Sequence, residues 1–213
     1  MFVRERMTPD PITVHEDTSV QDALHLMRER RVRRFPVVDG TGKLVGMVSE
    51  KDLLYASPSP ATTLSVYEIG YLLSKVKVKQ VMNVKPVTID DDCPLEEAAR
   101  IMVDSRVSGL PVLHQGRLVG IITETDLFKI FLELLGAREK GLRLTLRVPN
   151  RKGMLAALAG EVSRLGGDII ALGTFQGNSG AGELVLKVRE VDSQALAKGL
   201  SSLGVEVVDT RDA

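Results

Sequence analysis

Short apolar runs alternate with helix-like segments along the first part of the chain. Four runs rich in Val, Ile and Leu have the length of strands: RFPVV (34–38), LVGMVS (44–49), GLPVL (109–113) and LVGIIT (118–123). Because these runs are almost continuously apolar, we expect them to be covered on both faces. Between such runs, segment 20–27 places apolar residues at helical spacing, which predicts an amphipathic helix.

This pattern occurs twice. Met7 of the first copy aligns with Met82 of the second, and Asp52 aligns with Asp126. One residue is lost where GTGK aligns with QGR, at a turn that tolerates a change of length. Each copy predicts the order βαββα, and we expect the two thin layers to bury their apolar faces on each other about a pseudo-twofold axis.

Polar and helix-breaking residues set the limits of these elements. Thr18 and Gln21 predict a capping box at the start of the first helix, and Pro94 is expected at the first helical position of its counterpart. The predicted divisions are the first copy at 1–57, a linker that contains a helix at 58–76, and the second copy at 77–138.

Residues 142–213 follow a different order of elements. LRLTLRV alternates like a strand, and MLAALAGEVSRLGG predicts a helix. Two strands then flank the glycine-rich turn QGNSGAG, and a second helix and a final strand follow. The order βαββαβ is the ferredoxin-like plan. The predicted fold class is therefore α/β for the duplicated part and α+β for a separate C-terminal domain.

The composition is that of a globular chain without a dominant charge. Apolar residues make up 44% of the 213 residues, which is enough to bury cores. The 28 basic residues balance the 28 acidic ones, so the chain lacks the positive field that gathers nucleic acid or anionic lipid. The start has no secretion signal, no apolar stretch reaches the ~20 residues that span a bilayer, and Cys93 is the single cysteine. We expect a cytoplasmic protein without nucleic-acid or membrane partners.

The repeated PVV…LVGMVSEKDL and PVL…LVGIITETDL resemble the CBS-domain family. Paired CBS motifs form regulatory modules, so the resemblance implies an adenosine nucleotide (AMP, ADP or ATP) or S-adenosylmethionine as regulatory ligand. The C-terminal domain resembles the ACT family of amino-acid-sensing domains. The order CBS, CBS, ACT, together with the linker, resembles the acetoin-utilization AcuB-type proteins. Both domain types commonly pair with themselves, which implies a homodimer.

The strand-to-helix junctions hold matching polar residues in both copies. Ser49 precedes Asp52 by the same spacing as Thr123 precedes Asp126. This spacing is typical of a helix N-terminus, where the hydroxyl caps a backbone N–H and the acid complements the dipole. A carboxylate also accepts from both hydroxyls of a ribose, through charge-assisted bonds worth roughly 1.5–3 kcal/mol each. The two interpretations are compatible. We predict Asp52 and Asp126 as ribose ligands, with Ser49 and Thr123 near the phosphate or the 5′ side.

The resemblance also implies where an adenine would pack within each copy. These positions belong to the first strand and to the segment around the proline strand: Ile12, Thr13, Val32 and Pro36 in the first copy, and Val87, Thr88, Val107 and Pro111 in the second. Arg33 occupies a position that often contacts phosphate in nucleotide-binding CBS pairs, and its counterpart is Ser108. This asymmetry would give one site a preference for phosphorylated ligands. The alternative interpretation of RERRVRR is a solvated basic helix end.

The first strand-to-helix loop of the ACT-like domain departs from its family's pattern. Such domains usually carry an acidic residue and a Pro-Gly pair there, whereas this chain has Asn150, Lys152 and Gly153. Asn150, Gly153 and Met154 are the candidate residues for an amino-acid ligand, because a helix N-terminus can hold a carboxylate. Ordinary loop structure is the alternative.

The sequence contains no catalytic acid pair, metal cluster, phosphate-binding loop or nucleophile elbow, so we predict neither an enzyme nor a metal site. The leading hypothesis is a regulatory sensor that binds an adenosine ligand between the two CBS motifs and is linked to acetoin utilization. The alternative hypothesis is a CBS dimerisation scaffold without a sensing role, in which an amino acid binds to the ACT-like domain.

Overall fold

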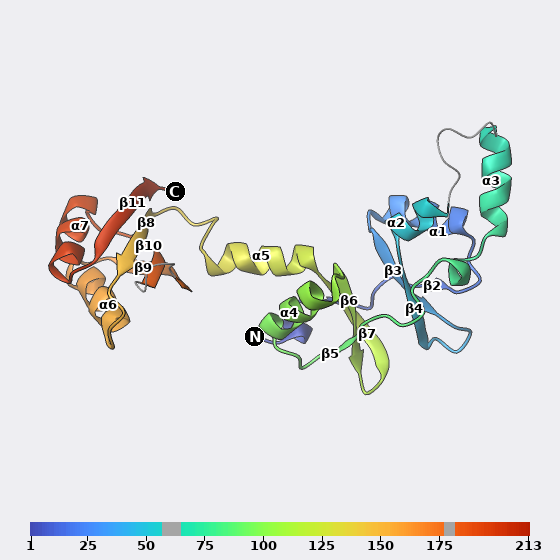
Figure 1. Ribbon diagram of the computed structural model, residues 1–213, viewed down its shortest axis with the longest axis horizontal. Helices are drawn as coiled ribbons and strands as arrows, with labels where there is room; N and C mark the ends of the chain where they lie inside the picture. The colour runs from blue at the N-terminus through green and yellow to red at the C-terminus, as the bar shows by residue number, and fades with distance from the viewer. Residues whose placement is uncertain (57–64, 177–181) are drawn as a thin grey trace. The chain divides into compact units, whose positions relative to one another are not determined.

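The computed structural model describes residues 1–56, 65–176 and 182–213, and Figure 1 shows its elements. The chain divides into two compact units, Met1–Leu127 and Phe128–Ala213. The first part of the predicted linker and most of the glycine-rich turn QGNSGAG lie outside the described residues.

The first copy has the predicted βαββα order. Its elements are β2 (Val14–His15), α1 (Val20–Arg30), β3 (Arg34–Val38), β4 (Leu44–Ser49) and α2 (Glu50–Tyr55). β3 lies between a parallel partner, β2, and an antiparallel partner, β4. The apolar face of α1 packs on this sheet, where Phe35 and Val37 are fully buried. The apolar runs therefore form strands because one face of each is covered by the helix of its own copy.

The second copy repeats this order. Its elements are β5 (Ile89–Asp90), α4 (Leu95–Ser105), β6 (Gly109–His114), β7 (Arg117–Thr123) and α5 (Glu124–Leu134). The short strand β1 (Thr8–Pro9) joins this sheet, which has the order β1-β7-β6-β5. The predicted linker helix is α3 (Val66–Lys75), which packs beside α1.

Each copy is completed by the segment that precedes the other copy. Near the N-terminus, Thr8 pairs with Ile121 of β7. Before the second copy, Met47 of β4 and Asn83 exchange two backbone hydrogen bonds of 2.9 Å each. The two copies are therefore interlocked through their leading segments, and they form one compact unit. Apolar patterning does not reveal this exchange, because the exchanged segments are short.

The exchange places a methionine of each leading segment against a glycine of the other copy. A Cβ atom at Gly46 would overlap Sδ of Met82 and lie 3.0 Å from the carbonyl oxygen of Asn83. Met7 lies against Gly120 in the same way. These glycines allow the leading segments to approach the strands closely.

A pair of Gly-to-Ala variants tests this packing. Gly46→Ala should lower the free energy of unfolding by about 1–3 kcal/mol, because the added methyl group overpacks the contact with Met82. Gly160→Ala lies inside a helix with open space around it, so it should raise stability by about 0.5–1 kcal/mol. Urea unfolding of the wild type and both variants measures these changes in the free energy of unfolding. Equal effects would contradict the packing described for Gly46.

The starts of α1 and α4 differ from the sequence prediction by one residue. The N-cap of α1 is Ser19, whose hydroxyl oxygen accepts from the Asp22 amide at 3.0 Å, so the predicted capping pair of Thr18 and Gln21 is wrong. Pro94 is the N-cap of α4 rather than its first helical residue. Ser19 and Pro94 have extended backbone angles, and the helical turn begins only after them.

The C-terminal domain has the predicted βαββαβ order. Its elements are β8 (Leu142–Val148), α6 (Met154–Arg164), β9 (Asp168–Gln176), β10 (Gly182–Arg189), α7 (Ser193–Ser202) and β11 (Glu206–Asp212). The strands form one antiparallel sheet with the order β11-β8-β10-β9. α6 and α7 cover one face of this sheet (Figure 1), and their buried Leu158, Leu196 and Leu200 pack on Leu144 and Leu184. The ferredoxin-like prediction is confirmed.

Candidate functional site

A cavity of about 260 Å³ lies between the two copies. Both copies and the leading segment of the second contribute to its lining, which consists of Arg34, Met47, Val48, Ser49, Asp52, Asn83, Arg106, Val107, Ser108 and Gly109. This volume lies just below the roughly 300–1,000 Å³ typical of small-molecule pockets. The cavity can therefore enclose part of a nucleotide, and the remainder would extend beyond it.

Ser49 and Asp52 form a capping box at the start of α2, on the wall of this cavity. The Ser49 hydroxyl donates to Oδ2 of Asp52 at 2.6 Å, and the Ser49 amide donates to the same oxygen at 2.8 Å. The Asp52 amide donates to Oγ of Ser49 at 3.3 Å. The helix-start interpretation is therefore confirmed. Within the described part of the chain, these bonds leave Oδ1 of Asp52 able to accept from a ligand hydroxyl.

The second copy has the same arrangement at the start of α5. The Thr123 hydroxyl and amide donate to Oδ2 of Asp126 at 2.7 and 3.1 Å. The next amide along the chain is also used in both copies: Glu50 donates to the carbonyl of Arg33 at 2.8 Å, and Glu124 donates to the carbonyl of Ser108 at 3.3 Å. Several backbone amides that a helix start could offer to an anion are thus engaged within the protein.

The cavity brings together four of the residues predicted from the sequence: Ser49, Asp52, Val107 and Ser108. The predicted residues outside its lining are Ile12, Thr13, Val32, Arg33, Pro36, Val87, Thr88, Pro111, Thr123 and Asp126. Of these, Pro36 and Pro111 are buried inside their sheets. The sequence analysis groups each carboxylate with adenine positions of its own copy, whereas this cavity joins the carboxylate of the first copy to Val107 and Ser108 of the second.

Sequence reasoning did not select three polar residues of the lining: Arg34, Asn83 and Arg106. Asn83 reaches the cavity through the exchanged leading segment, which has no signal in the sequence. Arg106 ends α4 in a left-handed conformation, as Arg31 ends α1. The sequence could have pointed to Arg34, because the repeat aligns this arginine with Gly109. A position with a long charged residue in one copy and a glycine in the other is a candidate for a functional difference between the copies.

Arg34 is the half-buried cation of the site. Burial is the main influence on its guanidinium and lowers the pKa of Arg34 below its ordinary value; Arg33 lowers it further. Glu124 and Asp126 act in the opposite direction and raise this pKa. An arginine remains protonated despite such a shift, so a positive charge stands at the cavity wall.

The predicted ACT ligand residues lie in the loop between β8 and α6. Asn150 is exposed, and Gly153 is the N-cap of α6 with a left-handed backbone. Met154 is 6% exposed and belongs to the core of the domain, so its side chain packs inward. The loop therefore offers a ligand mainly backbone groups and the side chain of Asn150.

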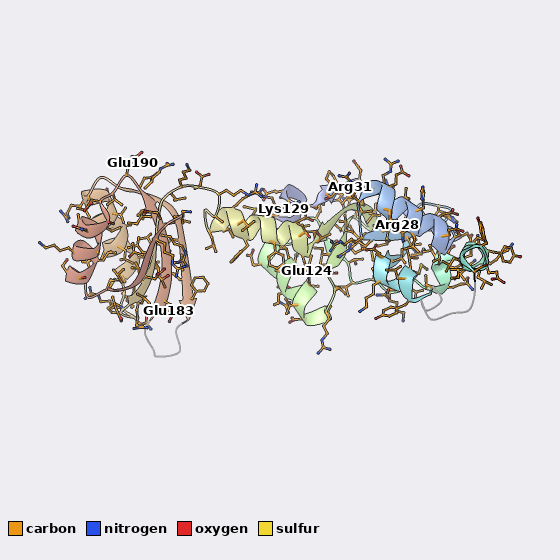
Figure 2. The ribbon with its side chains drawn as sticks, turned by 90° about the horizontal axis from the view of Figure 1, so that it is seen from above. Arg28, Arg31, Glu124, Lys129, Glu183 and Glu190 are labelled. Atoms are coloured by element: carbon orange, nitrogen blue, oxygen red, sulfur yellow. The ribbon has the colours of Figure 1, made fainter. Side chains whose placement is uncertain are left out.

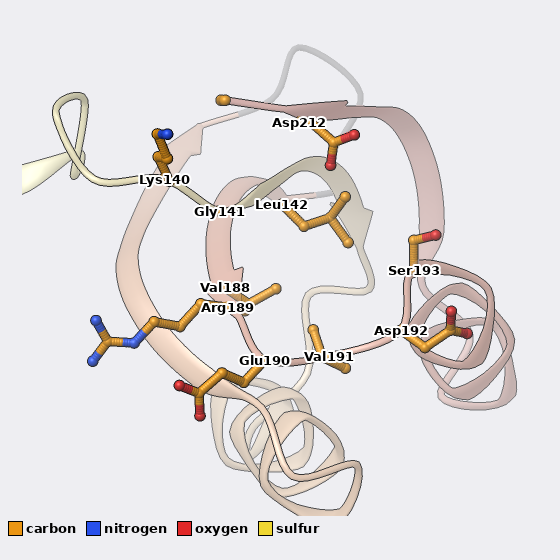
Figure 3. A pocket seen from close by; sticks show the side chains of 11 residues that line it. Lys140, Gly141, Leu142, Val188, Arg189, Glu190, Val191, Asp192, Ser193 and Asp212 are labelled. Carbon is orange, nitrogen blue, oxygen red and sulfur yellow. The ribbon is translucent and has the colours of Figure 1, made fainter.

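A second hollow, of about 680 Å³, opens at the other end of the same sheet. It lies where β8 begins and where β10 and β11 end, and Figure 3 shows Leu142, Val188 and Val191 toward its middle. Charged residues of its lining have partners within the domain, because Arg189 pairs with Asp168 at 2.6 Å and Asp192 caps α7. The sequence analysis did not predict this hollow.

Two further properties concern only the part of the chain that the structure describes. There, no group of three or more His, Cys, Asp and Glu side chains is arranged to hold a metal ion. No helix of that part has both the length and the apolar character needed to cross a bilayer.

Comparison with known families decides the class of the protein. The CBS domain description matches residues 3–59 and 78–133, which are the two copies of the repeat. The chain belongs to the CBS-domain family. The TTHA0829-like ACT domain description matches residues 140–211, so an ACT domain follows the CBS pair.

Three solved structures are similar to the CBS pair of this chain. One is a Vibrio cholerae protein assigned as the acetoin utilization protein AcuB, with 32% identity and a TM-score of 0.53, covering 65% of this chain and 96% of that one. The CBS pair of protein MJ0100, bound to 5′-methylthioadenosine and S-adenosyl-L-methionine, has 26% identity and a TM-score of 0.52 over 65% and 98% of the two chains. CBSX2 in complex with AMP has 34% identity and a TM-score of 0.50 over 62% and 96%.

Proposed function

We propose that this protein is a regulatory sensor whose CBS pair binds an adenosine-containing ligand between its two copies. The observation that carries this proposal is the cavity beside Asp52, which draws its walls from both copies. A ligand in such a place contacts both copies at once. It can therefore favour one arrangement of the pair by as much as its affinities for the two arrangements differ.

The geometry at Asp52 suits the sugar of such a ligand. The capping bonds hold the carboxylate in one orientation through Oδ2, and Oδ1 is left to accept from ribose hydroxyls. Asp126 has the same capping geometry in the second copy, which supports its role as the ribose ligand of a second site. The similar CBS pairs that bind AMP, or S-adenosyl-L-methionine and 5′-methylthioadenosine, support an adenosine ligand here.

Two parts of the proposal concern the pathway and the assembly. The similarity to the Vibrio cholerae AcuB structure supports a link to acetoin utilization. CBS and ACT domains commonly pair with themselves, which supports a homodimer, and the ACT domain would bind an amino acid at the loop that contains Asn150.

Titration calorimetry of the full chain tests the proposed function. The chain is titrated with AMP, ADP, ATP, S-adenosylmethionine and a panel of amino acids. We expect saturable binding of at least one adenosine compound, because the cavity offers a carboxylate and two guanidinium groups to such a molecule. Silence for every adenosine compound, with binding of an amino acid, would instead favour a scaffold whose sensing domain is the ACT domain.

A further inference from the structure

The hollow of about 680 Å³ at the start of β8 has an apolar floor. Leu142 and Val191 are half-buried there, and both pack against the core of the ACT domain, to which the fully buried Val188 belongs. The loop that contains Asn150 follows the other end of β8. The seven residues of this strand separate the two places by roughly 20 Å, at about 3.4 Å per residue. The hollow is therefore distinct from the candidate amino-acid site.

One carboxylate lies in the same row of the sheet as this floor. Leu142 is directly opposite Val188 of β10 on one side and Asp212 of β11 on the other. Residues directly opposite each other in antiparallel strands place their side chains on the same face. Asp212 is therefore on the face that α6 and α7 cover, and Figure 3 shows its side chain pointing toward the hollow. Two backbone hydrogen bonds of 2.8 and 2.9 Å between Gly141 and Ala213 hold this end of β11 beside β8.

The Asp212 carboxylate is able to bind a ligand, because the domain does not use it. Among the residues that the structure describes, its side chain makes no hydrogen bond and no ion pair. By contrast, Arg189 pairs with Asp168, and the Asp192 carboxylate accepts from the Ala195 amide at the start of α7. Asp212 is thus an unused anion beside an apolar surface.

The charge of the lining favours a cation over an anion. The lining holds three acids and two bases: Glu190, Asp192, Asp212, Lys140 and Arg189. Since Asp168 already neutralises Arg189, the acids exceed the remaining base. The start of α7, where an anion could otherwise bind, is occupied by the carboxylate of Asp192. Glu190 lies on the outside of the domain in Figure 2, and its side chain points away from the hollow in Figure 3. Asp212 is therefore the acid placed to receive a cation on the floor.

We propose that this hollow binds a small aliphatic amine, with its ammonium group on Asp212 and its aliphatic part on the apolar floor. A primary amine is protonated near neutral pH, as the side chain of lysine is. The Cβ atoms of directly opposite residues lie about 4.5–5.5 Å apart, so an amine bonded to Asp212 places its carbon atoms beside Leu142. This inference goes beyond the proposed function, because it concerns another ligand and another part of the ACT domain.

NMR titration of the full chain with 3-methylbutylamine tests the inference. The amine should shift the amide signals of Leu142, Val191 and Asp212 in a saturable way and leave the signal of Asn150 in place. Ethylamine carries the same charge on a shorter body and should bind at least about tenfold more weakly, since it buries less apolar surface. 3-Methylbutanoate has the same aliphatic body with the opposite charge, and it should not bind.

Two variants separate the role of Asp212 from that of the general charge. Asp212→Asn should weaken binding of the amine by about tenfold or more, because it removes the charge from the hydrogen-bonded pair. Glu190→Gln is the matched control: it removes an acid of the same lining whose side chain points away, and it should leave the affinity within about twofold. Within the described part of the chain neither acid has a partner, so both variants should fold like the wild type, which circular dichroism checks.

Leucine distinguishes a simple amine from an amino acid at this hollow. It is 3-methylbutylamine with a carboxylate on the carbon that bears the nitrogen. Because the acids of the lining repel that carboxylate, leucine should bind here at least about tenfold more weakly than the amine. If leucine binds as tightly as the amine, the hollow is an amino-acid site and the inference is wrong.

Three other results would overturn the inference. The first is a wild-type chain whose signals around the hollow show no saturable shift with the amine. The second is 3-methylbutanoate binding as tightly as the amine. The third is an Asp212→Asn chain that titrates like the wild type. None of these results bears on the adenosine ligand of the CBS pair, because that proposal is tested with other compounds.

Discussion

Asp52→Ala should lower the affinity for the adenosine ligand by about one to two decades. The change removes the carboxylate that accepts from the ribose, and charge-assisted bonds of roughly 1.5–3 kcal/mol correspond to that loss at 1.4 kcal/mol per decade. The variant also loses half of the capping box at α2, so its stability should fall by about 0.5–2 kcal/mol. Calorimetric titration measures the affinity, and urea unfolding measures the stability.

The chain contains a matched control for the capping effect. Ser19 and Asp22 form a related side-chain pair at the start of α1: the Ser19 hydroxyl donates to Oδ2 of Asp22 at 2.6 Å, and the Asp22 amide donates to Oγ of Ser19 at 3.0 Å. Asp22 is not part of the cavity lining. Asp22→Ala should therefore lower stability, by no more than Asp52→Ala does, and leave ligand affinity unchanged. If the titration curves of Asp52→Ala and Asp126→Ala both match the wild type, the ribose assignment is wrong.

Phe35→Ala should destabilise the CBS pair by about 3–5 kcal/mol and leave the unfolding of the ACT domain unchanged. Phe35 is fully buried in the core of the first copy, and the variant leaves a cavity there. Leu158 is equally buried in the separate core of the ACT domain, so Leu158→Ala should lower only the stability of that domain, by about 2–5 kcal/mol. The two compact units have independent cores, and this independence produces the expected selectivity.

Differential scanning calorimetry of the two variants measures the effect. Each variant should shift one unfolding transition to lower temperature while the other transition keeps its midpoint. A single transition that moves by the same amount in both variants would show that the units unfold together, contrary to the division described here.

The sequence is sufficient to predict the order of elements and the chemistry of the helix starts. The apolar runs form β3, β4, β6 and β7 because their side chains are buried, and burial is what the hydrophobic pattern reports. The Ser49–Asp52 and Thr123–Asp126 pairs are local in the chain, so their spacing alone predicts their hydrogen bonds.

The composition of the cavity depends on contacts between distant segments, which the sequence does not specify. Asn83 reaches β4 through two backbone hydrogen bonds, and any residue type can make such bonds. The position of the guanidinium of Arg34 depends on the absence of a side chain at Gly109. The capping prediction at α1 failed by one residue because Thr18 and Ser19 are both good caps, and the choice depends on backbone angles.

A crystal structure of the full chain grown with AMP tests the central claim most directly. The account predicts AMP between the two copies, with its ribose hydroxyls on Oδ1 of Asp52. AMP bound away from Asp52, or a cavity that holds no nucleotide at a saturating concentration of AMP, would contradict it.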